Sequence, residues 1–388
     1  MSAETELVIT ALGAVTPVGL SAAATAASLR AGIARLDEIE SSAVPGAQFA
    51  GEPMIGGRVQ LERYHGERGP WEWPGHDRFA APNPTEPERM VAGGHARLVE
   101  LLVPALRECV ASARVGAMPS QGAVVLYLGL DNAEPGAAAV ASLAEHALER
   151  ILRAEGWSAA PGSGAKVVPI AAGRAAALVA LARAAADLRE GRAALAIVGG
   201  VDSLVRPEVA EHLERTGRLK GPQRPHGVSP GEAAAFICVE TALRAAARGA
   251  PTLARVLGFA VTAEPTVGTD EPNQARGLTH ALREARRGAE PFKAPPLFVC
   301  DLNGDRYRAM EWGFASMRAY HDLHGDEEVW HPADSIGDSG AASGAVCLVW
   351  AATALCRNLA GNERVVVWGA SETPERAAAT LAPPERKN

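Results

Sequence analysis

A single arginine occupies a place in this chain that suits nucleophilic chemistry. The small-residue loop Ala171-Ala172-Gly173 leads from a short apolar strand into an Ala-rich helix, which begins near Arg174. A helix N-terminus lowers the pKa of a thiol and offers backbone N–H groups to an oxyanion. Residues 168–177 contain no Ser, Thr or Cys, and an arginine stays protonated and is no nucleophile. Because a cation is unfavourable there, we expect a carboxylate from elsewhere in the chain to compensate it.

Two later segments place polar residues directly after apolar runs. The run 297–299 continues into Cys300-Asp301-Leu302-Asn303-Gly304-Asp305, in which Asn-Gly-Asp predicts a turn. Cys300 has no His near it in the sequence and Asp301 would raise its pKa, so we interpret it as a buried residue rather than a nucleophile. Asp338 follows Ser335-Ile336-Gly337. His331, before Pro332, is either a ligand-binding residue of that loop or a structural one.

The composition is that of an ordinary globular protein. The chain has 388 residues, of which 47% are hydrophobic and 21% charged, and a net charge of −7, which argues against nucleic acid or an anionic membrane as partner. No apolar run spans a membrane and the N-terminus lacks signal-peptide features, so we expect a cytoplasmic location. The five cysteines are Cys109, Cys238, Cys300, Cys347 and Cys356. They show no C-x-x-C spacing, so we expect no bound metal. We also expect no cofactor.

Strands and helices alternate along the chain, and the strands are continuously apolar, which predicts an α/β fold with buried sheets. Expected strands are 7–14, 124–130, 166–170, 194–198 and 233–240, and expected helices are 22–31, 86–113, 137–155, 174–189 and 207–215. Residues 40–90 are rich in Pro and Gly and predict irregular structure, with Trp71 and Trp73 as loop anchors, a lid or a partner surface.

The chain also repeats itself, which indicates an internal duplication. Residues 12–16 have an echo at 257–262, at an offset of 245. At an offset of 170, Leu178-Val179 matches Leu348-Val349, Gly191 matches Gly361 and Gly199 matches Gly369. We therefore expect one half at 1–248, with insertions at about 40–90 and 130–160, and a second half at 249–388.

Over nearly its whole length the chain resembles the β-ketoacyl synthases of the thiolase superfamily. The best-matching segments are 8–19, 178–203, 231–240 and 335–344. The resemblance implies the thiolase fold, with five layers α-β-α-β-α, two sheets from two duplicated halves, and two central helices that start near Arg174 and Gly340.

The same resemblance indicates a degenerate catalytic site. Arg174 (Gly173 if the register slips by one) stands at the family's nucleophilic Cys, Cys300 or Asp301 at its first His, and Asp338 at its second His. In place of the family's Phe-Gly-Phe-Gly-Gly loop stands Trp368-Gly369-Ala370-Ser371-Glu372. No residue is predicted to be catalytic. Candidate binding residues are Gly173, Asn303, His331 and Glu232, the last from the family's Gly-Glu-Gly-Ala motif.

Two interpretations of these replacements stay open. In the first, Arg174 lies within about 4 Å of Asp338 or Asp301 and forms a structural ion pair that plugs the old site. In the second, the same residues line a rebuilt pocket that binds a ligand or performs other chemistry. We expect a solvated face, or salt bridges across a dimer interface, to be formed by Arg306, Arg308 and Arg318.

The expected function is that of a dimeric binding or partner scaffold, and the resemblance points to fatty acid or polyketide metabolism. The resemblance implies a homodimer through the strand at 166–170, or a heterodimer with an active ketosynthase, with acyl carrier protein as a further candidate partner. A chain length factor, the catalytically silent partner of a ketosynthase, is the analogue that the resemblance suggests. The analogy is loose, because this chain lacks the Gln that such proteins usually have at the position of the nucleophilic Cys. The alternatives are an acyltransferase or hydrolase that acts on acyl-thioesters with an Arg/Asp/Cys site, and a purely structural role.

Overall fold

The computed structural model describes residues 5–39, 48–49, 52–61, 95–117, 122–132, 136–158, 164–221, 224–361 and 363–385. The predicted irregular segment at 40–90 lies largely outside these residues, as do Trp71 and Trp73. Within them, short strands occur at β2 (Asp37–Glu38), β3 (Gln48–Phe49), β4 (Glu52–Pro53) and β5 (Ile55–Gly56).

Ten strands form the central sheet, in the order β12-β11-β13-β14-β10-β1-β9-β8-β6-β7. The first half of the chain supplies β1 (Leu7–Val15), β6 (Val124–Leu130), β7 (Ala165–Ala171), β8 (Leu195–Ser203) and β9 (Glu232–Thr241). The second half supplies β10 (Ala254–Ala263), β11 (Leu297–Cys300), β12 (Glu328–Trp330), β13 (Val365–Ala370) and β14 (Glu375–Ala382).

The two groups of five strands share one topology. In each group the first two pairings are antiparallel (β1–β9–β8 and β10–β14–β13) and the next two are parallel (β8–β6–β7 and β13–β11–β12). A short antiparallel ladder, Leu7–Val256 to Ile9–Ala254, joins the groups edge to edge. The duplicated thiolase fold is therefore confirmed, although hydrogen bonding through this ladder makes one continuous sheet where we expected two separate ones.

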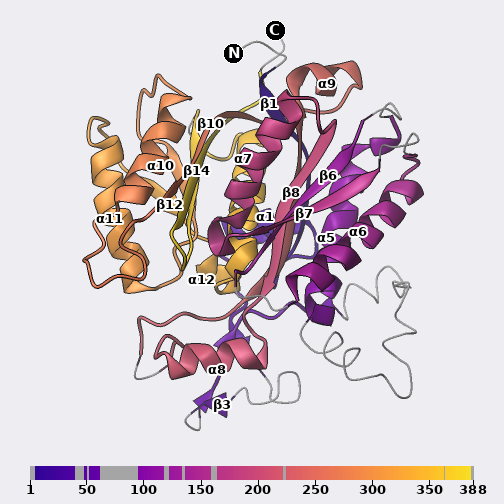
Figure 1. The fold of residues 1–388 in the computed structure, drawn as a ribbon. Coiled ribbons are helices and arrows are strands. Elements are labelled where there is room, and N and C mark those ends of the chain that lie inside the picture. The colour runs from indigo at the N-terminus through magenta and orange to yellow at the C-terminus, as the bar shows by residue number, and fades with distance from the viewer. Residues whose placement is uncertain are drawn as a thin grey trace, which may run out of the picture.

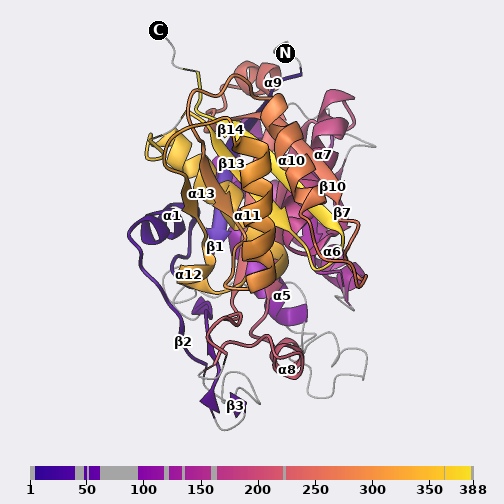
Figure 2. The same ribbon diagram turned by 90° about the vertical axis from the view of Figure 1, so that its left-hand side faces the viewer.

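Helices lie between and outside the two halves of the sheet, which gives the five layers (Figures 1 and 2). The middle layer contains α7 (Ala176–Arg189) and α13 (Ser343–Cys356), preceded by the 3-10 turns η3 (Gly173–Ala175) and η4 (Gly340–Ala342). One outer layer contains α5 (Ala96–Ala113) and α6 (Ala137–Ala154), and the other α10 (Arg276–Arg287) and α11 (Arg306–Tyr320). The remaining helical segments are α1 (Ala22–Arg30), η2 (Val115–Ala117), α8 (Pro207–Arg215), α9 (Ala242–Ala247) and α12 (Ala333–Ile336).

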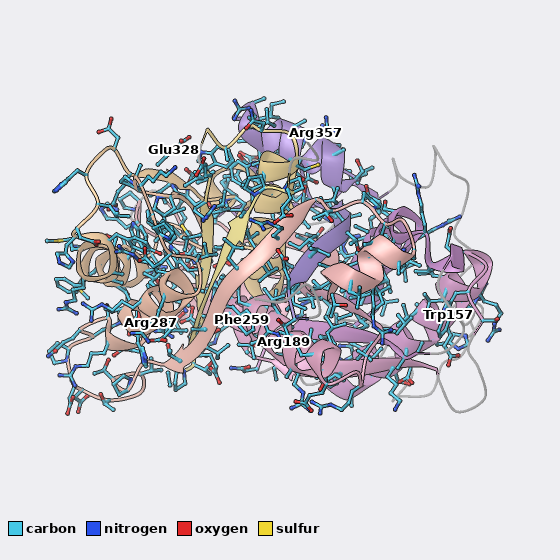
Figure 3. The ribbon with its side chains drawn as sticks, turned by 90° about the horizontal axis from the view of Figure 1, so that it is seen from above. Trp157, Arg189, Phe259, Arg287, Glu328 and Arg357 are labelled. Atoms are coloured by element: carbon cyan, nitrogen blue, oxygen red, sulfur yellow. The ribbon has the colours of Figure 1, made fainter. Side chains whose placement is uncertain are left out.

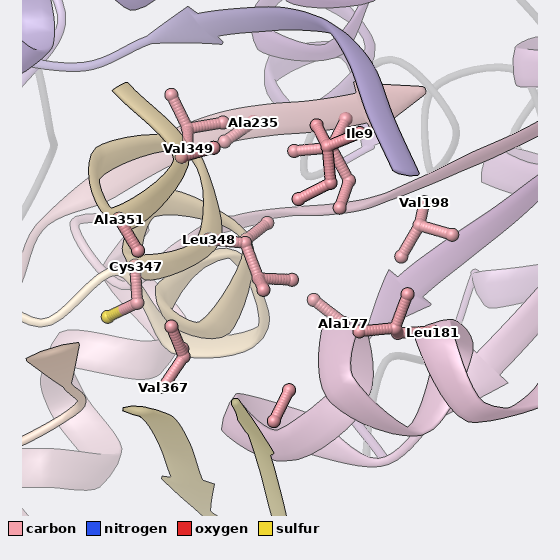
Figure 4. Packing of buried hydrophobic residues seen from close by; sticks show 14 of the residues in the cluster. Ile9, Ala177, Leu181, Val198, Ala235, Cys347, Leu348, Val349, Ala351 and Val367 are labelled. Atoms are coloured by element: carbon pink, nitrogen blue, oxygen red, sulfur yellow. The ribbon is translucent and has the colours of Figure 1, made fainter. Parts of the chain in front are cut away.

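The largest apolar core lies around the middle layer. Leu181 of α7 and Leu348 of α13 are buried there with Ile9 and Val198 of one half-sheet and Val367 of the other (Figure 4). Small side chains let these helices approach closely, as the many alanines predict. At the end of α7, the Arg189 guanidinium lies 5.4 Å from the ring centre of Phe259 in β10, so this helix contacts both halves (Figure 3).

Equivalent glycines mark the duplication. A Cβ on Gly13 of β1 would lie 2.1 Å from the Ala105 carbonyl oxygen of α5, and a Cβ on Gly258 of β10 would lie 2.3 Å from the Ala285 carbonyl oxygen of α10. Both glycines thus allow a helix backbone to rest on a strand, which explains the sequence echo at an offset of 245.

The second echo needs a correction at the helices. Gly173 and Gly340 both have positive φ, +49° and +52°, and open η3 and η4 at an offset of 167 rather than 170. The offset of 170 holds for the following strands, which begin at Leu195 and Val365. The second copy therefore has three extra residues between its central helix and the next strand.

Part of the predicted insertion at 130–160 is helix α6, which connects β6 to β7 as α11 connects β11 to β12. The segment before α5 and the segment 204–231, which contains α8, have no counterpart of similar length in the second half. The domain boundary at 248/249 stays a prediction.

Candidate functional site

Arg174 is buried at the start of the first central helix and is paired with Asp338. It belongs to η3, directly after the edge strand β7, and only 6% of it is exposed. Its Nε lies 3.0 and 3.1 Å from the two carboxylate oxygens of Asp338, and its Nη2 also contacts Oδ2. The predicted ion pair is thus confirmed, and it joins the N-terminal ends of the two central helices.

Asp338 accepts hydrogen bonds from several directions. Asn303 Nδ2 donates to its Oδ2 over 2.6 Å, and the backbone N–H of Gly340 in η4 donates to its Oδ1 over 2.9 Å. Burial opposes ionisation of this carboxyl, but the charge and hydrogen bonds of Arg174 outweigh burial and hold its pKa below the ordinary value. Asp338 is therefore a charged group that fixes Arg174, Asn303 and η4 to one another.

Glu372, which follows β13, brings three guanidinium groups together. Its Oε1 lies 2.7 Å from Arg174 Nη1, 2.9 Å from Arg218 Nη2 and 3.0 Å from Arg308 Nη2. Burial raises the pKa of the Glu372 carboxyl, but the three arginine charges more than reverse that effect and leave it well below the ordinary value. Glu372 and Arg218 are members of the site that the sequence did not identify.

Arg308 is buried, contrary to the expectation of a solvated face. Its side chain is 4% exposed, and its Nη1 lies 3.1 Å from Asp301 Oδ2. Asp301 also accepts a hydrogen bond of 2.9 Å from the backbone N–H of Ala370 and is not bonded to Arg174. Burial raises the pKa of Asp301. Arg306 and Arg318 are exposed, as expected.

Cys300 is fully buried at the end of β11, as predicted, and burial raises its pKa. A thiol in that state is a poor nucleophile. His331 is one-third exposed and pairs through Nδ1 with Asp334 over 3.0 Å. Asn303 shares its turn with Gly304, whose φ is +91°, and Asp305 caps α11 by accepting from the Tyr307 N–H over 2.9 Å, so the predicted turn is confirmed.

Two other candidate residues differ in their distance from this cluster. A Cβ on Gly173 would lie 3.3 Å from Ser371 Oγ, so Gly173 borders the cluster. Glu232 forms a separate buried group, in which its carboxylate accepts hydrogen bonds from Arg97, from Ser203 Oγ over 2.8 Å and from the backbone N–H of Val59 over 2.8 Å. In this structure Glu232 fixes the segment before α5 to the sheet.

Asp202, at the end of β8, is a buried carboxyl that the sequence did not identify. Its Oδ2 accepts a hydrogen bond of 2.9 Å from the backbone N–H of Ala341 in η4. Burial raises its pKa to about 6. A raised pKa in the folded state means that the folded protein binds the proton more tightly, so this stabilising contribution is complete below about pH 4 and is lost as the pH rises through about 6.

Comparison with Asp202→Asn therefore reveals a pH dependence. We expect the unfolding free energy of the wild type, relative to the variant, to fall by up to about 3 kcal/mol between pH 4 and pH 7, since two pKa units are worth about that much. Urea denaturation at several pH values measures it. The carboxyls of Asp338 and Glu372 titrate in both proteins, so their effects cancel in the difference. A difference that stays constant with pH contradicts this assignment.

The cluster as a whole is a charged, hydrogen-bonded plug. Arg174, Arg218 and Arg308 face Asp301, Asp305, Asp338 and Glu372, and every one of these seven groups has an opposite charge within 3.1 Å. Within the described parts of the chain, no three His, Cys, Asp or Glu side chains form a group that could hold a metal ion. No helix among the described residues is long and apolar enough to cross a membrane.

Comparison with known proteins gives a family match over part of the chain. Residues 158–245 match the family model of the β-ketoacyl synthase N-terminal domain. A search of curated proteins finds no match. The chain thus has the fold of the thiolase-type ketosynthases, and its residues 158–245 are similar to the N-terminal domain of the β-ketoacyl synthases.

Several solved structures share the fold at low sequence identity. The ketosynthase from module 6 of the bacillaene synthase of Bacillus subtilis 168 superimposes with a TM-score of 0.73 at 13% identity, over 98% of this chain and 72% of that chain. The ishigamide ketosynthase/chain length factor superimposes with a TM-score of 0.70 at 19% identity, over 98% of this chain and 99% of that chain. A type II polyketide acyl-carrier protein in complex with its ketosynthase bound to the hexaketide gives 0.72 at 14% identity, over 98% and 99%.

Proposed function

We propose that this chain is a non-condensing ketosynthase-like protein that acts as a dimeric partner scaffold. The observation that carries the proposal is Arg174, which stands at the start of the central helix and is held there by Asp338 at 3.0 Å. A helix start occupied by a paired guanidinium offers no thiolate. The carboxylates of Asp301 and Asp338 accept hydrogen bonds and would repel an oxyanion. Nucleophile and oxyanion stabilisation are therefore lost together.

The edge of the sheet supports a role in assembly. Among the described residues, strand β7 pairs only with β6, and Val167, Val168 and Ile170 on it are partly exposed. An apolar edge strand of this kind needs a partner. A second copy of the chain or a related ketosynthase has the matching architecture. The chain length factor among the similar structures supports the heterodimer, and the complex with an acyl-carrier protein supports that carrier as a third component. A cytoplasmic location remains part of this proposal.

The alternative of an acyltransferase or hydrolase has weaker support. Cys300 would be its nucleophile, but the thiol is 0% exposed and burial raises its pKa. Its neighbour Asp301 is engaged with Arg308 and with the Ala370 N–H.

Intact-mass measurement separates these functions. After incubation with acyl-thioesters such as acetyl and malonyl coenzyme A, we expect the mass of the folded protein to be unchanged, because no accessible thiolate lies at the site. An active ketosynthase treated in parallel provides the positive control, and Cys300→Ser provides the matched variant. An acyl adduct that is present on the wild type and absent from Cys300→Ser overturns the scaffold proposal in favour of acyl transfer.

A further inference from the structure

We propose that Arg174, Arg218 and Arg308 form a binding site for the phosphate group of a small phosphorylated ligand, and that Glu372 occupies this site in the free protein. The proposal goes beyond the scaffold function and does not depend on it.

The three arginines come from different parts of the fold and converge on one point. Arg174 lies in η3, Arg218 between α8 and β9, and Arg308 in α11, yet all three guanidinium groups contact the same oxygen of Glu372, Oε1. One carboxylate oxygen has two lone pairs for these three donors. A phosphate monoester has three terminal oxygens, so each guanidinium could bind its own oxygen. The cluster therefore offers more donors than the single carboxylate oxygen can accept, which a phosphate could use in full.

The arginines stay fixed when Glu372 moves away. Each has a second acidic partner: Asp338 for Arg174, Asp301 for Arg308 at 3.1 Å, and Asp305 for Arg218 at 3.1 Å. The side chain of Glu372 is 50% exposed, so its carboxylate can be hydrated again at low cost. Displacement of Glu372 thus leaves a site whose three arginines are already in place, which reduces the entropy lost on binding.

An open hollow of about 330 Å³ provides access from solvent. Its lining includes Arg218, Arg308, Glu372 and Tyr307, and three further carboxylates, those of Glu271, Asp305 and Glu311. Arg174 does not line the hollow, although it contacts Glu372, so the Glu372 carboxylate lies between Arg174 and the open space. The volume is that of a small-molecule site, and Tyr307, 41% exposed, offers its ring as an apolar contact beside the charged end.

A buried donor without a partner also points to a missing acceptor. The Nε of Arg308 has no hydrogen-bond partner among the described residues, although the side chain is only 4% exposed. Buried polar atoms in native proteins are nearly always paired, and each exception requires an explanation. A bound anion at the arginine cluster supplies acceptors at this place.

Calorimetric titration with inorganic phosphate at low ionic strength tests the proposal. We expect Glu372→Gln to bind phosphate about tenfold more tightly than the wild type, because the competing carboxylate is removed. Glu271→Gln is the matched control: Glu271 is exposed and lines the same hollow, so this variant removes an equal charge without freeing an arginine. The phosphate affinity of this variant should stay within about twofold to threefold of the wild type. That change is smaller than the change expected from gaining one charge-assisted hydrogen bond.

Further titrations define the ligand. Adding Arg218→Gln to Glu372→Gln should weaken phosphate binding about tenfold. Phenyl phosphate should bind Glu372→Gln more tightly than inorganic phosphate if the hollow receives the rest of the ligand, and acetate should bind more weakly.

Circular dichroism confirms that each variant is folded. For the wild type, the thermal midpoint should rise in phosphate but not in chloride of equal ionic strength. No gain in phosphate affinity for Glu372→Gln, or an equal gain for Glu271→Gln, overturns the proposal.

Discussion

Replacing Asp338 with Asn is expected to destabilise the protein by about 3–5 kcal/mol at pH 7.5, the cost of leaving one partner of a buried ion pair unpaired. Asn has nearly the volume of Asp, so the change removes the charge and leaves the packing in place. Arg174, 6% exposed, would then retain only Glu372, whose carboxylate is half exposed and shared with two other arginines. The unfolding free energy from urea denaturation measures the loss.

Two further variants separate this charge effect from others. Glu284→Gln removes one partner of a surface pair, since the side chains of Arg287 and Glu284 are 73% and 33% exposed, and should cost less than about 1 kcal/mol. Arg174→Met combined with Asp338→Leu removes both buried charges and should recover most of the loss. If Asp338→Asn costs no more than Glu284→Gln, the ion pair does not stabilise this site.

The same variant has a defined dependence on pH. The pKa of Asp338 is lower in the folded state than its ordinary value, so its contribution is present above the unfolded pKa, about 3.9, and is lost as the pH falls through the folded value. The difference between wild type and Asp338→Asn should therefore shrink in acid. Asp202 behaves in the opposite way, because its pKa is raised to about 6. The two carboxyls accept hydrogen bonds from neighbouring N–H groups of the same turn η4, those of Gly340 and Ala341, and can be distinguished by the sign of this effect.

The sequence predicts the fold well because strands and small-residue turns have local signatures. Residues 124–130 form β6 with the predicted ends. The echo of Leu12-Gly13 at 257–258 identifies two glycines that have the same role, since each allows a helix backbone to contact its strand closely. The predicted alignment of the two central helices differs from the structure by three residues, because Ala-rich segments match in several registers. The positive φ of Gly173 and Gly340, which sets the register, is a property of the backbone that the sequence does not display.

The site was only partly predictable. The pairing of Arg174 with Asp338 follows from electrostatics, because a buried cation at a helix start needs a carboxylate. Glu372 and Arg218 lie on irregular segments, where no periodicity predicts which way a side chain points. For Arg308 the sequence does contain a signal of burial. It lies three and four residues before Glu311 and Trp312, on the buried stripe of α11, whereas Arg306 and Arg318 lie off that stripe.

Arg174→Cys is expected not to restore condensation, even though it returns a thiol to the start of the central helix. Asp338 and Asp301 would face the new thiol where the resemblance to ketosynthases implies two imidazoles, and their negative charges disfavour a thiolate. They would also repel the oxyanion of the transition state, and the loss of one oxyanion donor alone costs about 10²–10³ in rate. His331 does not compensate, since its Nδ1 pairs with Asp334.

The assay must exclude a trivial failure to fold. Arg174→Cys leaves Asp338 unpaired, so it should be made together with Asp338→Asn, and the thermal midpoint of the double variant should be measured first. Mass spectrometry then detects the condensed product of acetyl and malonyl thioesters, with an active ketosynthase as positive control. We expect a rate at least about 10³-fold below that control, because both the general acid–base groups and the oxyanion donors are missing. Condensation by the double variant at the rate of the control would falsify the scaffold function, since it would mean that the rest of the catalytic machinery is intact and that the Arg174–Asp338 pair alone silences it.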